Sequence, residues 1–169
     1  MGAEGWNDLW RLRVGEPNPH FDRRWTGLKN TTRMWERLYD WLPAVFDDAA
    51  MAYAMFGWAN LTVTAGGSEL GTKSSHQLGM QQHVAPLINE SGARVVVAAN
   101  DRVKVQMDRW ATQAGGSIAR FDDIEGWRVN IGSRVVVAAK VGHPSLRISR
   151  MEYVRQLRIL ISAAEQLAK

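Results

Sequence analysis

The pattern of hydrophobic and polar positions changes near the middle of the chain. In the first half, apolar residues recur at helical spacing. In the second half, the uninterrupted hexamer RVVVAA occurs at residues 94–99 and again at 134–139. Short β-branched runs of this kind are typical of strands that are buried on both faces. We therefore expect these two segments to be neighbouring central strands of one sheet.

Three helices are expected before the first of these strands. Pro43 is suited to the first position of the second helix, and Asp47 and Asp48 then follow in its first turns. Residues 44–59 are apolar on nearly every side apart from the two acids, which indicates either a buried helix or a subunit interface. The third helix is expected from about residue 74 to residue 89.

A helix is expected between the two hexamers, because Asn100 or Asp101 can cap a segment that ends at Gly115. The rival interpretation is a strand over residues 102–107, where apolar and polar positions alternate. Two shorter strands are then predicted on either side of the acidic turn DDIEG. They are Ser117–Phe121 and Trp127–Ile131.

The final helix has the strongest pattern in the sequence. Ser149 and Glu152 have the spacing of a capping box. The predicted inner stripe consists of Val154, Leu157, Ile161, Ala164 and Ala168.

The complete order of elements predicts an α/β protein of the α+β kind. We expect a helical N-terminal part packed on a mixed four-stranded sheet that is flanked by helices. A chain of 169 residues fits a single domain, residues 1–169. Residues 1–91 would form its mainly helical, tryptophan-rich part and residues 92–169 its basic α/β part.

Composition removes several classes of chemistry. The chain has no cysteine, which excludes thiol catalysis, iron–sulfur clusters and cysteine-based zinc sites. No HExxH, Walker A, GxGxxG, GxSxG or EF-hand pattern occurs. We therefore expect no cofactor, no metal and no catalytic residue. The N-terminus resembles no targeting signal, and the longest apolar run, residues 49–59, is too short for a membrane span. The expectation is a cytoplasmic protein without a membrane partner.

Positive charge is concentrated in the second half. Residues 92–169 contain thirteen Lys and Arg against seven Asp and Glu, a net charge of +6. Cations near the start of the last helix gain nothing from its dipole, so they favour an anionic partner such as DNA or RNA. A solvated helix face would show the same pattern. The predicted nucleic-acid-binding residues are Lys140, His143, Arg147, Arg150, Arg155 and Arg158.

Tryptophan is unusually frequent, with eight in the chain. Trp35 and Trp41 recur at helical spacing and are expected in the core. Trp6, Trp10 and Trp25 lie in irregular segments and are predicted to be interface residues, since tryptophan is common at the centre of protein interfaces. They support an alternative function, a protein-interaction, assembly or inhibitory factor such as a virion component, or a homo-oligomer.

A third interpretation comes from residues 90–169. The order WRVNIG, RVVVAAK and then a helix with EYVRQL resembles the strand, strand and helix core of restriction-endonuclease-like nucleases. The resemblance implies that Asp122, Asp123 and Glu125, with Lys140, would hold a divalent ion and the attacking water. The sequence departs from the family pattern, because Ala138 occupies the position of the acid. The resemblance therefore implies a nuclease fold with a degenerate metal site.

Overall fold

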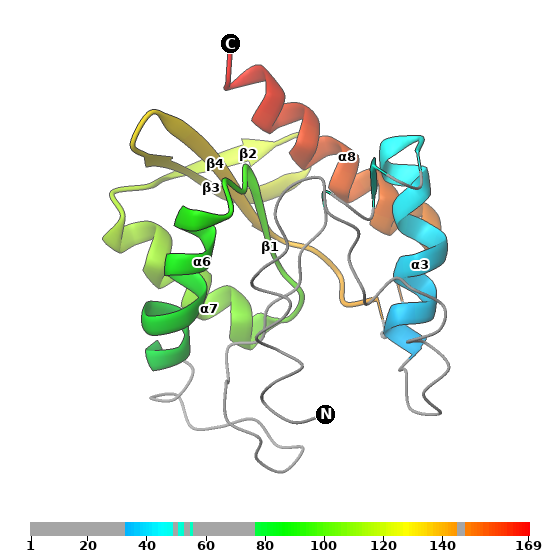
Figure 1. The fold of residues 1–169 in the computed structure, drawn as a ribbon, viewed down its shortest axis with the longest axis horizontal. Helices are drawn as coiled ribbons and strands as arrows, with labels where there is room; N and C mark the ends of the chain where they lie inside the picture. Colours follow the sequence, from blue (N-terminus) through cyan, green and yellow to red (C-terminus); the bar gives the residue numbers. More distant parts are fainter. Residues whose placement is uncertain (1–32, 49–50, 53–54, 56–76, 145–147) are drawn as a thin grey trace.

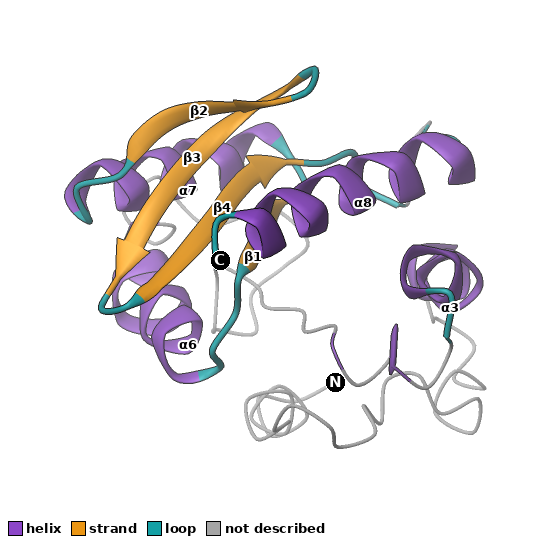
Figure 2. Cartoon of the chain, turned by 90° about the horizontal axis from the view of Figure 1, so that it is seen from above, coloured by secondary structure: helices purple, strands orange, loops and turns teal. Residues whose placement is uncertain are grey.

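The protein is built around a four-stranded mixed sheet with helices on both faces (Figure 1 and Figure 2). The computed structural model describes residues 33–48, 51–52, 55, 77–144 and 148–169. This architecture confirms the predicted α+β fold class. Trp6, Trp10, Trp25 and Arg147 lie outside the described residues.

The sheet has the strand order β1-β4-β3-β2. β1 pairs in parallel with β4, whereas β4 with β3 and β3 with β2 are antiparallel. The strands are β1 (Val95–Ala98), β2 (Ser117–Phe121), β3 (Ile124–Ile131) and β4 (Arg134–Lys140). The two hexamers are therefore neighbours, as predicted. β1 nevertheless lies at the edge of the sheet that the described residues form, so only the second of the two hexamers, in β4, is a central strand.

β4 is buried on both faces. Val137 and Ala139 belong to one hydrophobic core, and Val136 and Ala138 belong to a second core on the opposite face. The alternation follows from the pleat, which points successive side chains to opposite sides. A run without polar residues is required here because both faces of β4 are covered.

The helix predicted between the hexamers is α7 (Asp101–Gln113), and the strand alternative is wrong. The Asn100 side chain accepts a hydrogen bond from the Val103 amide at 3.0 Å, which satisfies one free donor of the first turn. Gly115 has a φ of 72°, a left-handed conformation that favours glycine and ends the helix. α7 covers the sheet face opposite the one covered by α8 (Figure 2).

The hairpin between β2 and β3 is tighter than predicted. Only Asp122 and Asp123 form the turn, and Asp122 has a φ of 52°. β3 begins at Ile124 rather than Trp127 because Ile124 pairs with Phe121 and both side chains are buried in the first core.

The last helix is α8 (Arg150–Gln166). Ser149 caps it by accepting the Glu152 amide at 3.1 Å, but the Glu152 carboxylate binds Arg155 and Gln156, so the predicted capping box is only half formed. The predicted inner stripe is also displaced. Val154 and Ile161 are partly buried and Ala168 is exposed, whereas the buried residues are Tyr153, Leu157, Leu160 and Ala164. The buried residues differ from the predicted inner stripe because α8 packs against both the sheet and α3.

The helix α3 (Arg33–Phe46) continues through Pro43, so the prediction that Pro43 starts a new helix is wrong. The helix ends three residues beyond the proline, and Asp47 has a φ of 57°. Pro43 lies in the last turn, so the hydrogen bond lost with its missing amide N–H affects only the end of α3. Asp48 then accepts the Met51 amide at 3.1 Å and begins the next helical segment.

α3 packs on α8 through the first core, to which Leu38, Leu42 and Val45 contribute. The Trp41 side chain is buried against Tyr153, with ring centroids 5.5 Å apart, which confirms that Trp41 is a core residue. The described part of the helical half is therefore packed on the α/β half.

The opposite sheet face is covered by α7 and by the helical segment that precedes β1. This segment contains a π-helical turn, η3 (Met80–Val84), followed by α6 (Ala85–Glu90). Met80 and Ile88 complete the second core. The wide turn lies directly before Pro86, where the Ala85 amide donates to the Met80 carbonyl. α6 ends at Glu90, one residue beyond the predicted end at about residue 89, and Gly92 beyond it has a φ of 69°.

Shortening single side chains of α8 tests which of its residues are buried. Leu160→Ala leaves a cavity at a fully buried site and should lower the free energy of unfolding by about 2 to 5 kcal/mol. Ile161→Ala, at the neighbouring partly buried position, is the matched control and should lower it by clearly less. Urea denaturation measures both values. A larger loss for Ile161→Ala would contradict the orientation of α8.

Candidate functional site

The described residues of the predicted nucleic-acid-binding set lie on different elements. Lys140 ends β4 on the side that faces α7, whereas Arg150, Arg155 and Arg158 lie on α8. His143 is partly buried, and burial lowers its pKa below the ordinary value of 6.5. His143 is therefore mainly neutral at neutral pH and adds little positive charge.

Arg155 joins α8 to the turn of the β2–β3 hairpin. Its Nη1 and Nη2 donate to the two carboxylate oxygens of Asp123 at 2.8 and 2.9 Å. Its Nε and Nη2 also donate to Glu152, at 2.9 and 2.8 Å. The Arg155 guanidinium lowers the pKa of both the Asp123 and the Glu152 carboxyl groups. One positive charge is thus shared by two carboxylates.

Arg158 joins α8 to the end of α3. It donates to the Ala44 carbonyl from Nη2 at 2.7 Å and from Nε at 3.1 Å, and Nη2 also pairs with Asp47. The last carbonyl groups of a helix have no partner within the helix, so a guanidinium is well placed there. Like Arg155, Arg158 already has an internal structural role.

Five exposed arginines form no ion pair or side-chain hydrogen bond within the described part of the chain. They are Arg94, Arg102, Arg109, Arg128 and Arg150. Only Arg150 belongs to the set predicted from sequence. Arg102 and Arg109 are seven residues apart on α7 and therefore lie on the same side of that helix. The seven-residue spacing of Arg102 and Arg109 is the signal in the sequence that identifies this pair, which the predicted set does not include.

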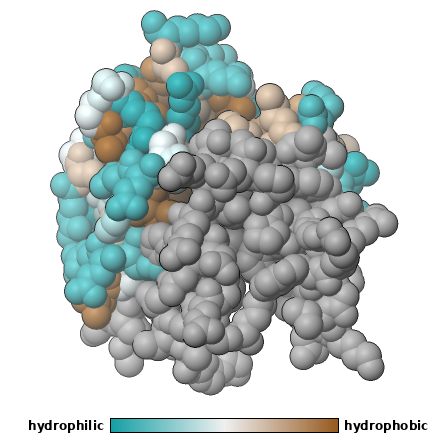
Figure 3. Space-filling view, in the orientation of Figure 1, coloured by the Kyte–Doolittle hydropathy of each residue, from teal (hydrophilic) through white to brown (hydrophobic). Residues whose placement is uncertain are grey.

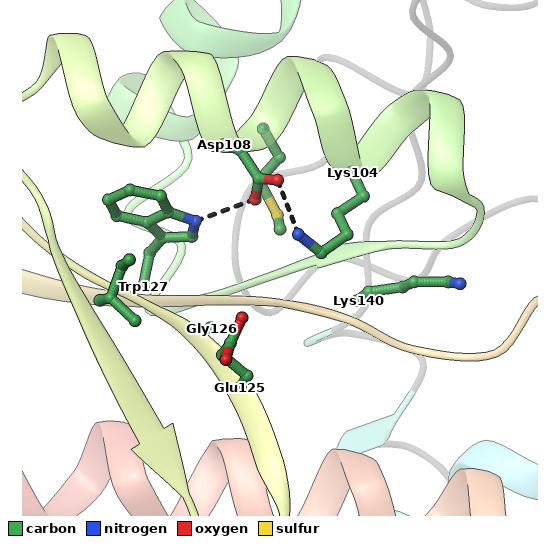
Figure 4. Close-up of a pocket in the computed structure, with 8 residues that line it drawn as sticks. Lys104, Asp108, Glu125, Gly126, Trp127 and Lys140 are labelled. Atoms are coloured by element: carbon green, nitrogen blue, oxygen red, sulfur yellow. Dashed lines mark hydrogen bonds and ion pairs between the residues drawn. The ribbon is translucent and has the colours of Figure 1, made fainter.

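The side on which α7 lies also contains a small cavity, with a volume of about 160 Å³. Among the side chains that line this cavity, Trp127 lies at one end and Lys140 at the other, with Lys104 and Glu125 between them (Figure 4). The cavity is lined by Lys104, Met107 and Asp108 of α7, and by Ile118, Glu125, Gly126, Trp127 and Lys140 of the sheet.

Asp108 organises the wall of this cavity. One of its oxygens accepts the Trp127 indole N–H at 2.9 Å, and the other accepts Lys104 Nζ at 2.6 Å. These bonds hold the indole ring and the Lys104 ammonium group in place. Lys140 is paired with Asp101 at 2.5 Å, in a contact where both side chains remain accessible to solvent. Glu125 forms no ion pair with another described residue.

The acidic turn does not bring its carboxylates together. Asp123 binds Arg155, while Glu125 lies in the cavity on the other side of the sheet. Within the described residues, no group of three His, Asp or Glu side chains is arranged to hold a metal ion. The described part of the chain thus brings Lys140 close to Glu125 but not to Asp122 or Asp123.

The surface around α6 and α7 is largely hydrophilic where it faces the viewer, with smaller hydrophobic areas between (Figure 3). Among the described residues, no helix is long and apolar enough to cross a membrane.

The chain matches no protein-family model, no curated protein and no solved structure. The resemblance to restriction-endonuclease-like nucleases gains nothing from these comparisons and stays a prediction.

The lowered carboxyl pKa values predict how the Arg155 contact depends on pH. A lowered pKa stabilises the fold above the ordinary carboxyl pKa, and the contribution is lost as the pH falls through the lowered value. Arg155→Gln should therefore lower stability at pH 7, and the difference from the unaltered protein should shrink as the pH falls below the ordinary carboxyl pKa values of 3.8 and 4.5.

Thermal unfolding across this pH range measures the effect, and Arg150→Gln is the control, because Arg150 is an exposed arginine of the same helix without an ion pair. A pH-independent difference for Arg155→Gln would contradict the assignment.

Proposed function

We propose that the basic part of the chain, residues 92–169, binds nucleic acid through the side that carries α7. The observation that carries the proposal is the pair Arg102 and Arg109, exposed on one side of α7 and without an ion pair or side-chain hydrogen bond to any described residue. Lys104 and Lys140 provide two further ammonium groups at the cavity, which lies around α7 from the two arginines. Phosphate groups are the partners that such a set of cations favours.

The ion pairs on this side do not prevent phosphate binding. Both the Lys104–Asp108 and the Lys140–Asp101 pairs are accessible to solvent. Exposed pairs of this kind contribute about 0 to 1 kcal/mol, so a phosphate can compete for the ammonium groups. Residues 92–169 also retain their net charge of +6, which attracts a polyanion before any contact forms.

The original set around α8 is less suited to the same role. Arg155 binds two carboxylates, and Arg158 binds a carbonyl and a carboxylate. A phosphate at either guanidinium would compete with contacts that join α8 to the hairpin and to α3. We therefore assign these two arginines to the fold and keep Lys140 in the proposed interface.

A protein-interaction role is the second candidate. Met51 and Met55 are one turn apart in a helical segment and more than half exposed, and Met151 is 81% exposed. Exposed apolar side chains are typical anchors of protein contacts. Trp6, Trp10 and Trp25 remain predicted interface residues on this view. Binding that survives high salt and needs no nucleic acid would favour this function.

Removing the two exposed arginine charges from α7 tests the proposal. The double variant Arg102→Gln, Arg109→Gln should weaken binding of a fluorescent oligonucleotide at about 50 mM salt. Each lost phosphate contact should also flatten the slope of log affinity against log salt by about 0.7 to 0.9. Fluorescence anisotropy across a salt series measures both quantities. Stability should change by no more than about 0.5 kcal/mol, because both side chains are exposed.

The matched control is Arg128→Gln, Arg150→Gln, which removes two other exposed arginines that form no ion pair with a described residue. Its salt slope should remain that of the unaltered protein. A flatter slope of log affinity against log salt in this control alone would show that the interface is not on α7. Absence of binding to any DNA or RNA at low salt would refute the proposed function.

A further inference from the structure

We propose that the cavity beside α7 accepts one unpaired nucleobase, so that the protein prefers single-stranded over fully paired nucleic acid. The inference rests on the proposed function and names the form of nucleic acid that the same side takes. The cavity has a volume of about 160 Å³. An engineered protein cavity of about 150 Å³ holds a benzene molecule, so one planar ring is a suitable occupant.

The apolar part of the lining suits a flat ring. Ile118 and Trp127 are cross-strand partners on β2 and β3, so their side chains lie next to each other on one sheet face. Ile118 is 69% exposed, which is unusual for a large aliphatic residue beside a tryptophan. Met107 contributes a third apolar side chain from α7. Stacking on an aromatic side chain is the common way in which proteins hold an unpaired base.

The polar part of the lining suits the edge of a base and its phosphate. The Glu125 carboxylate can accept hydrogen bonds from an amino group of a base. Lys104 and Lys140 provide ammonium groups for the phosphate that follows the base. The Trp127 indole N–H is already satisfied by Asp108, so the ring presents only its faces and carbon edge. The combination of an apolar ring site, an acceptor and two cations matches a nucleotide better than an inorganic anion.

A base inside a duplex cannot reach such a site, because its faces are stacked and its edge is paired. It must first leave the stack, which costs a few kcal/mol. The occupant is therefore a base of a single strand or a free mononucleotide, which offers the same chemistry. The remaining phosphates of a strand would meet Arg102 and Arg109 of α7.

Four probes separate these possibilities: a single-stranded DNA, the matching duplex, an abasic strand of the same length and backbone charge as the single strand, and adenosine monophosphate. The single strand should bind about tenfold more tightly than the abasic strand. Binding of the abasic strand and the single strand with equal affinity would overturn the inference while leaving the proposed function in place. Binding of adenosine monophosphate alone would overturn the preference for a strand, and binding of no probe at about 50 mM salt would overturn both proposals.

Ile118→Glu tests the location of the base. It places a carboxylate at an exposed position of the cavity wall and should reduce single-strand binding to the level of the abasic strand. Leu78→Glu is the matched control, since Leu78 is also an exposed aliphatic residue but does not line the cavity. Circular dichroism checks that both variants fold. An equal loss of affinity in the two variants would overturn the assignment of the cavity.

Discussion

The burial of β4 on both faces is the constraint on which the rest of the structure depends. Residues 137–140 pair with β1 on one side and residues 134–139 with β3 on the other, which satisfies backbone hydrogen bonds of a strand that has little access to water. Each face then requires a cover. α8, with α3 behind it, covers one core, and α7 with α6 and η3 covers the other.

This arrangement separates the positive charges into two groups. On the α8 side, Arg155 and Arg158 hold the helix against the hairpin and against α3, so their charges are used within the fold. On the α7 side, Arg102 and Arg109 have no internal role in the described part of the chain. β2 extends the sheet beyond β3, and the cavity forms where its hairpin meets α7. The same covering that completes the core therefore leaves the α7 side available to a partner.

The fold class and the order of the elements followed from local patterns. The two RVVVAA runs, the Asn100 cap and the Ser149 cap each gave the correct element, because their signals depend on neighbouring residues. The errors arose where tertiary packing decided. Pro43 was tolerated inside α3, and the stripe of α8 turned because that helix packs against two partners.

The candidate site was harder to predict than the fold. Charge counting identified a basic half, but it could not show that Arg155 faces Asp123, which is 32 residues away in sequence. It also could not show that Glu125 and Lys140 would line one cavity while Asp123 lies apart from them. Such pairings depend on strand register and on the placement of α8, which no local pattern contains. Arg102 and Arg109 differ from Arg155 and Arg158 in having no partner among the described residues, and only the structure shows this difference.

The most direct test of the account is a nuclear magnetic resonance titration of isotope-labelled protein with a single-stranded oligonucleotide at about 50 mM salt. The account predicts that the Trp127 indole N–H signal and the amides of residues 102–109 and 117–127 shift together as the strand is added. Residues 150–158, whose arginines include the paired Arg155 and Arg158, should change little. Shifts confined to residues 150–158, or a Trp127 signal that does not move while the strand binds, would contradict it.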